Sequence, residues 1–389
     1  MMQEAAVGLG QHRRRPAIDI FRGLAISCML LVNELPDEAG AYPLLLHSRW
    51  EGITFADLAF PGFVFSMGLA GALWFPKHSG DSAWTKTGII VRRGMLLFLL
   101  GCVLNQVPMI LRHMLYPEAG GSLWADLVDH GRIPGVLQRL GLVYVCGMAA
   151  VWRLRRDLWI GALALLLLAV SSLGFHLYHP AAPFSPEGNI SMALDSVFPG
   201  KAHCYLQGDF DPEGLYGIIA ATSSFLLGFL AGRCLTQGSH DDLSSIRFLL
   251  PGGISLMLLG YLWSMEDLVC KALWTAPYAL LTGGGFMLLL ALLQTLLCLQ
   301  PALAKVIFAP CRIMGTNALL LYLLSEMTIL LLWTLETSSG QPVFAFLWEI
   351  SLKGLVDIPF SIFLYAFLWL NVWLSVAIFF HKKHIYLKI

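Results

Sequence analysis

Residues 33–61, NELPDEAGAYPLLLHSRWEGITFADLAFP, form a polar stretch between two long apolar runs at 18–33 and 56–76. A helix that crosses a membrane needs about 20 mostly apolar residues, so each flanking run is close to the length of one span. Amide and ionisable side chains gather in the stretch: Asn33, Glu34, Asp37, Glu38, His47 and Asp57. This pattern predicts a polar site held at the ends of two membrane helices.

Apolar runs of the same kind recur along the chain. Only 13% of the 389 residues are charged, against about 25% in a soluble domain, and lipid permits only helices or closed barrels. Because the alternating pattern of barrel strands is absent, we predict an all-α bundle of about ten transmembrane helices. Residues 18–389 then form one membrane domain after a basic cytoplasmic segment at 1–17. The runs are 18–33, 56–76, 88–109, 133–152, 157–178, 213–232, 246–263, 275–298, 315–335 and 357–380.

The distribution of Lys and Arg predicts the orientation. With the N-terminus inside, eighteen of the 25 Lys and Arg residues fall on the inner side. Positive residues favour cytoplasmic loops, so we expect both termini in the cytoplasm and the polar stretch outside. The outer loop 179–212 is expected to form an ordered rim. Segments 41–50 and 343–352 are too short to span and are expected to be interfacial or re-entrant helices.

Net charge and the common motifs argue against several classes of protein. The formal net charge is zero, which argues against a nucleic-acid partner. No H-x-x-x-H, C-x-x-C or G-x-S-x-G motif occurs, so we predict neither a metal site nor a serine hydrolase. Cys204 and Cys270 both lie in loops placed outside, and a disulfide between them stays open.

Ionisable side chains within apolar runs are costly in lipid, so each is a candidate functional residue. Asp19 and Arg22 share a helix face, and either they form a local ion pair or Arg22 binds a phosphate. Arg139 and Glu326 are predicted to lie at similar depths below the outer surface. Pairing them is the cheapest way to bury both charges, and the pair either locks the bundle or binds a substrate.

Two interpretations remain open for the residues of the polar stretch. Asp57 follows Thr54 by three positions before an apolar run, as in a capping box, so it either caps a helix or serves a site. His47 is the histidine that lies beside Asn33 and Asp57 on the outer face. A lone histidine in an interfacial loop is usually a hydrogen-bonded bystander, and the residues alone do not separate that role from catalysis.

Seven blocks of the sequence carry a resemblance to a known family. Through them the chain resembles the heparan-α-glucosaminide N-acetyltransferases, transmembrane acyltransferases that use acetyl-CoA. The blocks follow one another in order from about residue 17 to the end of the sequence. They are AIDIFRGLAI (17–26), LLHSRWEGITFADLAFPGFVFSMG (45–68), RIPGVLQRLG (132–141), DPEGLYGII (211–219), KALWTAPYAL (271–280), GTNALLLYLLSE (315–326) and HKKHIYLKI (381–389).

The resemblance implies a reaction and a set of residues. Acetyl-CoA would be supplied from the cytosol, and an amine of a terminal glucosamine would be acetylated on the extracytoplasmic side. The family's catalytic histidine falls on His47, its essential asparagine on Asn33, and the aspartate of its ADL-FP block on Asp57. The family also implies a homodimer. Because the long N-terminal region of the animal members is not seen, we expect a bacterial member in the inner membrane.

Two chemical routes stay open for His47. A neutral imidazole can deprotonate the acceptor ammonium near pH 7, or it can attack the thioester and carry the acetyl group covalently. Asn33 is expected to orient His47 or to donate to the developing oxyanion, and Asp57 to fix the imidazole tautomer. The cytoplasmic candidates for the phosphates of CoA, which also suit positive-inside anchoring, are Arg22, Arg92, Arg93, Lys382 and Lys383.

The acceptor is the least determined part of the prediction. The acidic residues Glu34, Asp37 and Glu38 favour a cationic amino sugar over an anionic sulfated one, and Arg139 and Glu326 are further candidates for binding it. One alternative is another cell-envelope glycan, acylated on an amine or a hydroxyl. Another is a transporter or flippase, which fits the intramembrane charges, but the internal symmetry typical of that class is missing.

Overall fold

The computed structural model describes residues 15–78, 80–117, 121–237 and 243–387. Within these ranges the chain is helical and forms no β-sheet, so the predicted all-α class is confirmed. Each of the ten predicted apolar runs contains a helix. These are α1 (Pro16–Asn33), α2 (Ala59–Lys77), α3 (Ala83–Leu115), α5 (Val136–Leu154), α6 (Asp157–Tyr178), α8 (Gly217–Gln237), α9 (Ile246–Trp263), α10 (Ala276–Leu299), α13 (Ala318–Thr334) and α15 (Ile358–Lys382).

The number of membrane spans differs slightly from the prediction of about ten. Eight described helices are long and apolar enough to cross a membrane, or nine if α12 (Ala309–Thr316) and α13 are one span bent by 82°. Helix α5 falls outside this count because Gln138 and Arg139 lie in its first turn and lower its apolarity. The apolar helices indicate a multi-pass integral membrane protein.

Short helices fill the connections. They are α4 (Leu123–His130), α7 (Ile190–Asp195), α11 (Pro301–Ile307) and α14 (Val343–Ser351). The helix predicted at 343–352 is therefore present as α14. The one predicted at 41–50 is reduced to a 3₁₀ turn, Pro43–Leu45, so this part of the polar stretch is mostly irregular.

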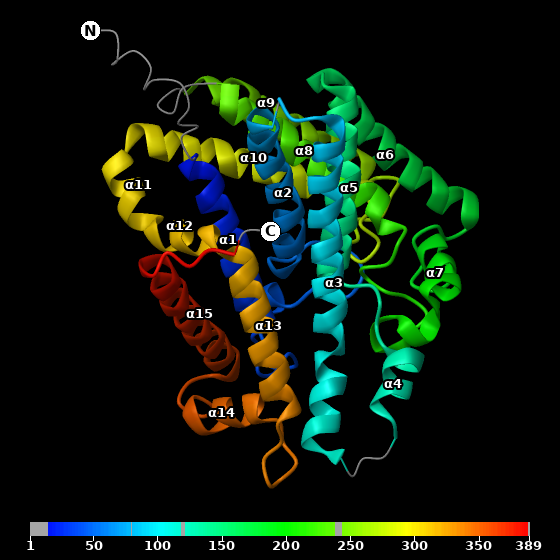
Figure 1. The fold of residues 1–389 in the computed structure, drawn as a ribbon, viewed down its shortest axis with the longest axis vertical. Coiled ribbons are helices and arrows are strands. Elements are labelled where there is room, and N and C mark those ends of the chain that lie inside the picture. Colours follow the sequence, from blue (N-terminus) through cyan, green and yellow to red (C-terminus); the bar gives the residue numbers. More distant parts are fainter. Residues whose placement is uncertain (1–14, 79, 118–120, 238–242, 388–389) are drawn as a thin grey trace.

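Helices α1 and α2 run side by side in opposite directions through the middle of the bundle (Figure 1). Helix α2 packs closely on α8, because a Cβ atom at Gly68 would lie 2.1 Å from the carbonyl oxygen of Phe225, and one at Gly228 would lie 2.2 Å from that of Phe65. Small residues allow this approach where lipid offers no hydrophobic driving force between helices. The contact fixes the position of α2, and therefore of Asp57 just before it.

The outer surface suits an apolar solvent. Large apolar side chains such as Val103 on α3 and Phe248 on α9 are 63% and 64% exposed, which is costly in water and favourable in lipid. Helix α3 has 33 residues and is therefore about 50 Å long, whereas the hydrocarbon core is about 30 Å thick. Its far end extends toward α4, beyond most of the bundle (Figure 1).

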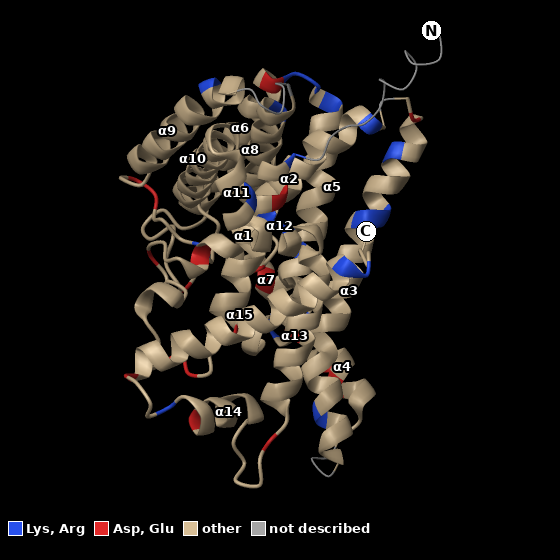
Figure 2. Cartoon of the chain, turned by 90° about the vertical axis from the view of Figure 1, so that its left-hand side faces the viewer, with Lys and Arg blue, Asp and Glu red and all other residues tan. Residues whose placement is uncertain are grey.

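Charges are unevenly distributed between the two ends of the bundle. Basic residues lie mainly toward the end where α1 and α3 begin, and many acidic residues lie in the loops toward α14 (Figure 2). This asymmetry agrees with the positive-inside pattern, although which end faces the cytoplasm stays a prediction. Most of the predicted cytoplasmic segment, residues 1–14, lies outside the described residues.

Candidate active site

The site begins where α2 begins. Asp57 lies in a 3₁₀ turn, Ala56–Leu58, and its side chain is fully buried. Its Oδ1 atom lies 2.9 Å from Nδ1 of His47, whose side chain is 49% exposed. Because a carboxylate oxygen only accepts, Nδ1 carries the hydrogen and the other ring nitrogen, Nε2, keeps a lone pair. His47 is therefore oriented as a base or a nucleophile whose reactive nitrogen is Nε2.

The second oxygen of Asp57 holds the carboxylate in place. Oδ2 accepts hydrogen bonds from the backbone N–H of Ser48 at 3.1 Å, and from the N–H and hydroxyl of Thr54 at 3.0 and 3.1 Å. The bond from the Thr54 N–H is half of a capping box. The two interpretations of Asp57 are thus compatible, since one oxygen caps the entry to α2 and the other faces the imidazole.

Lys271 is a third member of the site that the sequence analysis did not single out. Its Nζ atom lies 3.0 Å from Nδ1 and 3.2 Å from Nε2 of His47, and 3.7 Å from Oδ1 of Asp57. Burial lowers the pKa of Lys271, against the opposing charges of Asp57 and Glu213. Lys271 and His47 are 224 positions apart, so the sequence alone does not indicate this contact. The one signal that could have indicated it is that Lys271 is the first residue of the KALWTAPYAL block.

Tyr278 supports the site from α10. Its hydroxyl donates a hydrogen bond of 2.7 Å to the backbone carbonyl of Asp57, and its ring packs edge-on against Trp274. Both side chains are fully buried. The start of α10 therefore contacts the start of α2 directly beneath the carboxylate.

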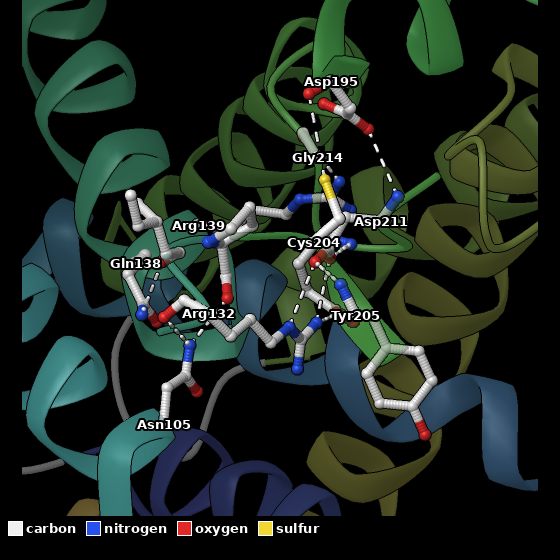
Figure 3. A network of polar contacts seen from close by, with 12 residues as sticks. Asn105, Arg132, Gln138, Arg139, Asp195, Cys204, Tyr205, Asp211 and Gly214 are labelled. Atoms are coloured by element: carbon white, nitrogen blue, oxygen red, sulfur yellow. Dashed lines mark hydrogen bonds and ion pairs between the residues drawn. The ribbon is translucent and has the colours of Figure 1, made fainter. Parts of the chain in front are cut away.

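The predicted pair between Arg139 and Glu326 is wrong. The guanidinium of Arg139 donates from Nη2 to the carbonyl of Gly214 at 2.8 Å and lies over the rings of Phe60 and Trp274. The loop before α8 reaches into the bundle and supplies this acceptor (Figure 3). The depth of a residue along a helix can be predicted from sequence. The partner of Arg139, however, depends on how α5 is rotated about its axis and on this loop, which the sequence does not show. Only 2% of the surface of Arg139 is exposed. Its role in substrate binding stays a prediction.

Glu326 pairs instead with Asn33. The side-chain amide of Asn33 donates to Oε1 of Glu326 at 3.0 Å and so joins α1 to α13. The structure therefore does not bring Asn33 to the imidazole of His47 as expected. Its catalytic role, and the substrate-binding role of Glu326, stay predictions.

The acidic residues after α1 differ in exposure, because Glu34 is buried, Asp37 is half-buried and Glu38 is exposed. Glu34 is 1% exposed, and burial, reinforced by the charge of Glu326, raises the pKa of its carboxyl to about 8. Asp37 accepts from the N–H of Ala39 in a local turn. Glu34 is thus mostly neutral near pH 7 and does not supply the negative charge predicted for choosing a cationic acceptor.

The predicted rim at 179–212 is ordered by a second polar network (Figure 3). Arg132 donates to both oxygens of Asp211, at 3.0 and 2.9 Å, and to Oε2 of Glu213 at 2.6 Å. Asp195 accepts from the N–H groups of Asp211 and Leu215, and burial raises the pKa of its carboxyl to about 6. The network fixes the loop that supplies the carbonyl partner of Arg139.

A cavity of about 260 Å³ lies between α1, α2, α3, α5 and α13. Arg22 and Arg93 contribute to its wall; Arg22 also lies 3.8 Å from Asp19 and donates to the carbonyl of Gly315, and Arg93 lies over the ring of Tyr144. Most of the remaining wall is apolar, including Met29, Phe63, Met67, Leu97 and Leu140.

Three of the predicted phosphate-binding residues do not contribute to this wall. Arg92 is exposed beside Arg93, and Lys382 and Lys383 are exposed at the end of α15. The chain does return to the cavity beyond them, because Leu387 lines it. Asn317 holds this returning segment by bonding the carbonyl of Ile385 and the N–H of Leu387.

The two cysteines considered for a disulfide are unpaired. Cys204 and Cys270 are both buried free thiols, and burial raises the pKa of each to about 11. Among the described residues, no cluster of His, Cys, Asp and Glu has the arrangement of a metal site.

Comparison with known proteins agrees with the resemblance seen in the sequence. No family model matches the chain. The chain is 29% identical over 271 residues to the heparan-alpha-glucosaminide N-acetyltransferase of Mus musculus, covering 57% of this chain and 39% of that protein. It is 28% identical over 271 residues to the Homo sapiens protein of the same name, covering 57% and 38%. The matched region is thus about two fifths of these relatives' length, and it supports a distant relationship to a family of transmembrane acetyltransferases.

Proposed function

We propose that the chain transfers the acetyl group of cytosolic acetyl-CoA to an amine of a glucosamine-type sugar on the extracytoplasmic side. The observation that carries the proposal is the orientation of His47 by Asp57 just before α2, a helix that also lines an apolar cavity. Arg22 and Arg93 contribute to the wall of that cavity.

The direction of the cavity follows from two antiparallel helices (Figure 1). On α1 the wall runs from Arg22 to Met29; on α2 it runs from Trp74 to Phe63. Asp57 precedes Phe63 by six positions, about 9 Å at 1.5 Å per residue. Along the axis of α2, the apolar part of the cavity therefore extends from the two arginines toward the end of the helix that Asp57 precedes. Arg22 and Arg93 would bind phosphates of CoA, and the acyl arm would extend along α2.

The chemistry at His47 requires a base and a positioned carbonyl carbon. Nε2 takes a proton from the acceptor ammonium, and the neutral nitrogen then forms a bond to the acetyl carbon. When the C–S bond breaks, CoA leaves as a thiolate, and the proton held by His47 can pass to it. The second proton, which the nitrogen loses as it becomes an amide, is released to water. On the covalent route Nε2 itself forms the first bond to the acetyl carbon. The tautomer set by Asp57 suits both routes.

The acceptor class rests on the relatives' names and on the surroundings of His47. Four acidic side chains, Asp57, Asp195, Asp211 and Glu213, interact with three basic ones, Lys271, Arg139 and Arg132. Charges of both signs thus meet in this region, and burial of Glu34 removes one reason to exclude an anionic sugar. The proposal therefore specifies an amine on the acceptor. It does not specify the charge on the rest of the glycan.

A transfer assay on the purified protein tests the proposal. Protein in detergent is incubated with acetyl-CoA labelled in the acetyl group and with glucosamine, and labelled N-acetylglucosamine is measured. We expect transfer by the wild type and its loss in His47→Ala. Counterflow of glucosamine without label transfer would instead identify a transporter and overturn the proposal.

A further inference from the structure

The geometry around Lys271 points to a role in the chemistry, and this inference rests on the proposed function. We propose that Lys271 is a catalytic residue that stabilises the negative charge on the acyl oxygen during transfer. It is the nearest cationic side chain to the His47 imidazole, with Nζ 3.0 and 3.2 Å from the two ring nitrogens.

The two nearly equal distances place the ammonium over the ring. A nitrogen equidistant from Nδ1 and Nε2 in the ring plane would collide with the carbon atom between them. Nζ of Lys271 therefore lies over the face of the imidazole and leaves the in-plane lone pair of Nε2 open. A carbonyl carbon approaching Nε2, or an amine beside it, would have the ammonium on one side of the reacting atoms.

Asp57 does not require Lys271 as a hydrogen-bond partner. The carboxylate already has His47 on Oδ1 and three donors on Oδ2. Lys271 lies 3.7 Å from Oδ1, which is longer than an ordinary hydrogen bond. An ammonium carries three N–H donors, so donors remain for a substrate oxygen. With 17% of its side chain exposed beside a half-exposed imidazole, Lys271 is reachable from the same side as His47.

The segment that carries Lys271 is tightly held. Asp267 accepts from the hydroxyl of Ser172 and lies 2.8 Å from Nε2 of His176, which anchors the segment to α6. The carbonyl of Val269 accepts from Gly52 at 2.8 Å. A fixed dipole or charge aimed at the reacting atoms stabilises a transition state better than a mobile one, because no reorganisation is needed.

Trp274 completes this anchoring. It is fully buried with φ of +52°, a conformation that costs free energy for a bulky residue, and its indole donates to Ser224 at 3.1 Å. Its own N–H donates to the carbonyl of Lys271 at 2.9 Å. These contacts hold the turn at Lys271–Trp274 in an unfavourable backbone conformation. They thereby fix the position of Lys271 beside His47.

The proposed role fits both routes of transfer. When a nitrogen forms a bond to the acetyl carbon, the π electrons of the carbonyl move to its oxygen, and the N–H of Lys271 donates to this oxyanion. The oxyanion then collapses, the C–S bond breaks and CoA leaves as a thiolate. The nucleophile is the acceptor amine on the direct route and Nε2 of His47 on the covalent one.

Steady-state kinetics of Lys271→Met and Lys271→Arg in the full-length protein test the proposal. Loss of one oxyanion donor typically costs about 10² to 10³ in kcat, so we expect that loss in Lys271→Met, with KM for acetyl-CoA within about threefold of the wild type. Lys271→Arg should recover at least about tenfold of it, because it keeps the charge and the donors. Lys353→Met, which removes a lysine paired with Glu349 rather than with His47 or Asp57, is the matched control and should keep full activity.

The outcomes separate this inference from the proposed function. If Lys271→Met keeps kcat while His47→Ala is inactive, Lys271 has no catalytic role and the proposed function stands. If the wild type itself transfers no label, the proposed function fails. Thermal unfolding of each variant distinguishes lost chemistry from lost folding. Should Lys271→Met not fold, Lys271→Gln carries the test, with a kcat below that of the Arg variant expected and a kcat equal to the wild type contradicting the role.

Discussion

The Nδ1 atom of His47 lies 2.9 Å from the Oδ1 atom of Asp57, a carboxylate whose other oxygen accepts three hydrogen bonds from Ser48 and Thr54. The carboxylate cannot rotate without breaking those bonds. The orientation of the imidazole is therefore built into the entry to α2, and a change at Asp57 should affect the tautomer more than the fold.

Asp57→Asn tests that orientation. The amide oxygen of asparagine can accept from Ser48 and Thr54, which leaves its NH₂ group facing Nδ1. The imidazole must then carry its hydrogen on Nε2 and loses its reactive lone pair. General-base catalysis contributes about 10² to 10⁴ in rate, and we expect kcat to fall within that range. Asp129→Asn, which changes an exposed aspartate on α4, is the control and should stay within about twofold of the wild type.

Neighbouring arginines on α3 provide a matched test of the CoA site. Arg93 lines the cavity, whereas Arg92 is exposed away from it. Hydrogen bonds to charged groups contribute about 1.5–3 kcal/mol, so Arg93→Ala should weaken acetyl-CoA binding by about 10- to 100-fold. Arg92→Ala should leave it unchanged. The affinity of each variant for acetyl-CoA is measured by calorimetry in detergent. Equal losses of affinity in the two variants would show that the cavity does not bind acetyl-CoA.

Glu34 should make stability depend on pH. Its pKa is raised from 4.5 to about 8 in the folded protein, so the folded state binds more protons than the unfolded state between these values. Its contribution to stability is complete below about pH 4.5, declines as the pH rises, and is lost above about pH 8. Glu34→Gln should remove this decline, so its melting temperature should exceed that of the wild type most clearly above pH 8. Parallel melting curves across this range would show that Glu34 is not buried.

The fold was largely predictable because lipid imposes a simple rule on backbone groups. Each predicted run became a helix, since about 20 apolar residues without water leave no other way to pair N–H and C=O groups. The bend of 82° between α12 and α13 was not predicted, because the apolar run was placed at 315–335 and most of α12, which contains Arg312, lies before it. Helix α3 was predicted to end at residue 109 but continues to Leu115, where its last turns pack beside α4.

The site was predictable only in part. His47 and Asp57 are ten positions apart in one loop, so local sequence and the resemblance together brought them to notice. Lys271 and the Asn33–Glu326 bond depend on how α9–α10 and α13 rotate against α1 and α2. Side-chain depth is readable from sequence, but rotation about a helix axis is not, and this is why Arg139 was given the wrong partner.

The alkaline limb of the pH–rate profile tests the charge on Lys271. Burial lowers its pKa below the ordinary 10.5; Asp57 and Glu213 oppose this effect, and Arg139 adds to it. Nζ also lies against the imidazole of His47. The ammonium is the form that the proposed role requires, and it is lost as the pH rises through the lowered value, so kcat should fall at a lower pH than an ordinary lysine would give. In Lys271→Arg that fall should disappear, and an unchanged profile would contradict the assignment.

The bond between Asn33 and Glu326 should be measurable as coupling. Residues in direct contact show interaction free energies of about 0.5–3 kcal/mol in double-mutant cycles. We expect Asn33→Ala and Glu326→Ala to lower stability by less together than the sum of their separate effects. Additive effects on the free energy of unfolding would show that the two side chains do not meet. The same variants assayed for acetyl transfer would reveal whether Asn33 acts on His47 as the resemblance implies.

Transfer across a sealed membrane is the most direct test of the central claim. Purified protein is reconstituted in liposomes, labelled acetyl-CoA is supplied on one side and glucosamine only on the other, and the protein's orientation is determined by protease access. We expect labelled N-acetylglucosamine on the glucosamine side when acetyl-CoA faces the end of the protein that bears Arg22 and Arg93. With His47→Ala we expect at least about 10³-fold less of this product. Transfer by His47→Ala at the wild-type rate, or transfer only when both substrates share one side, would contradict the central claim.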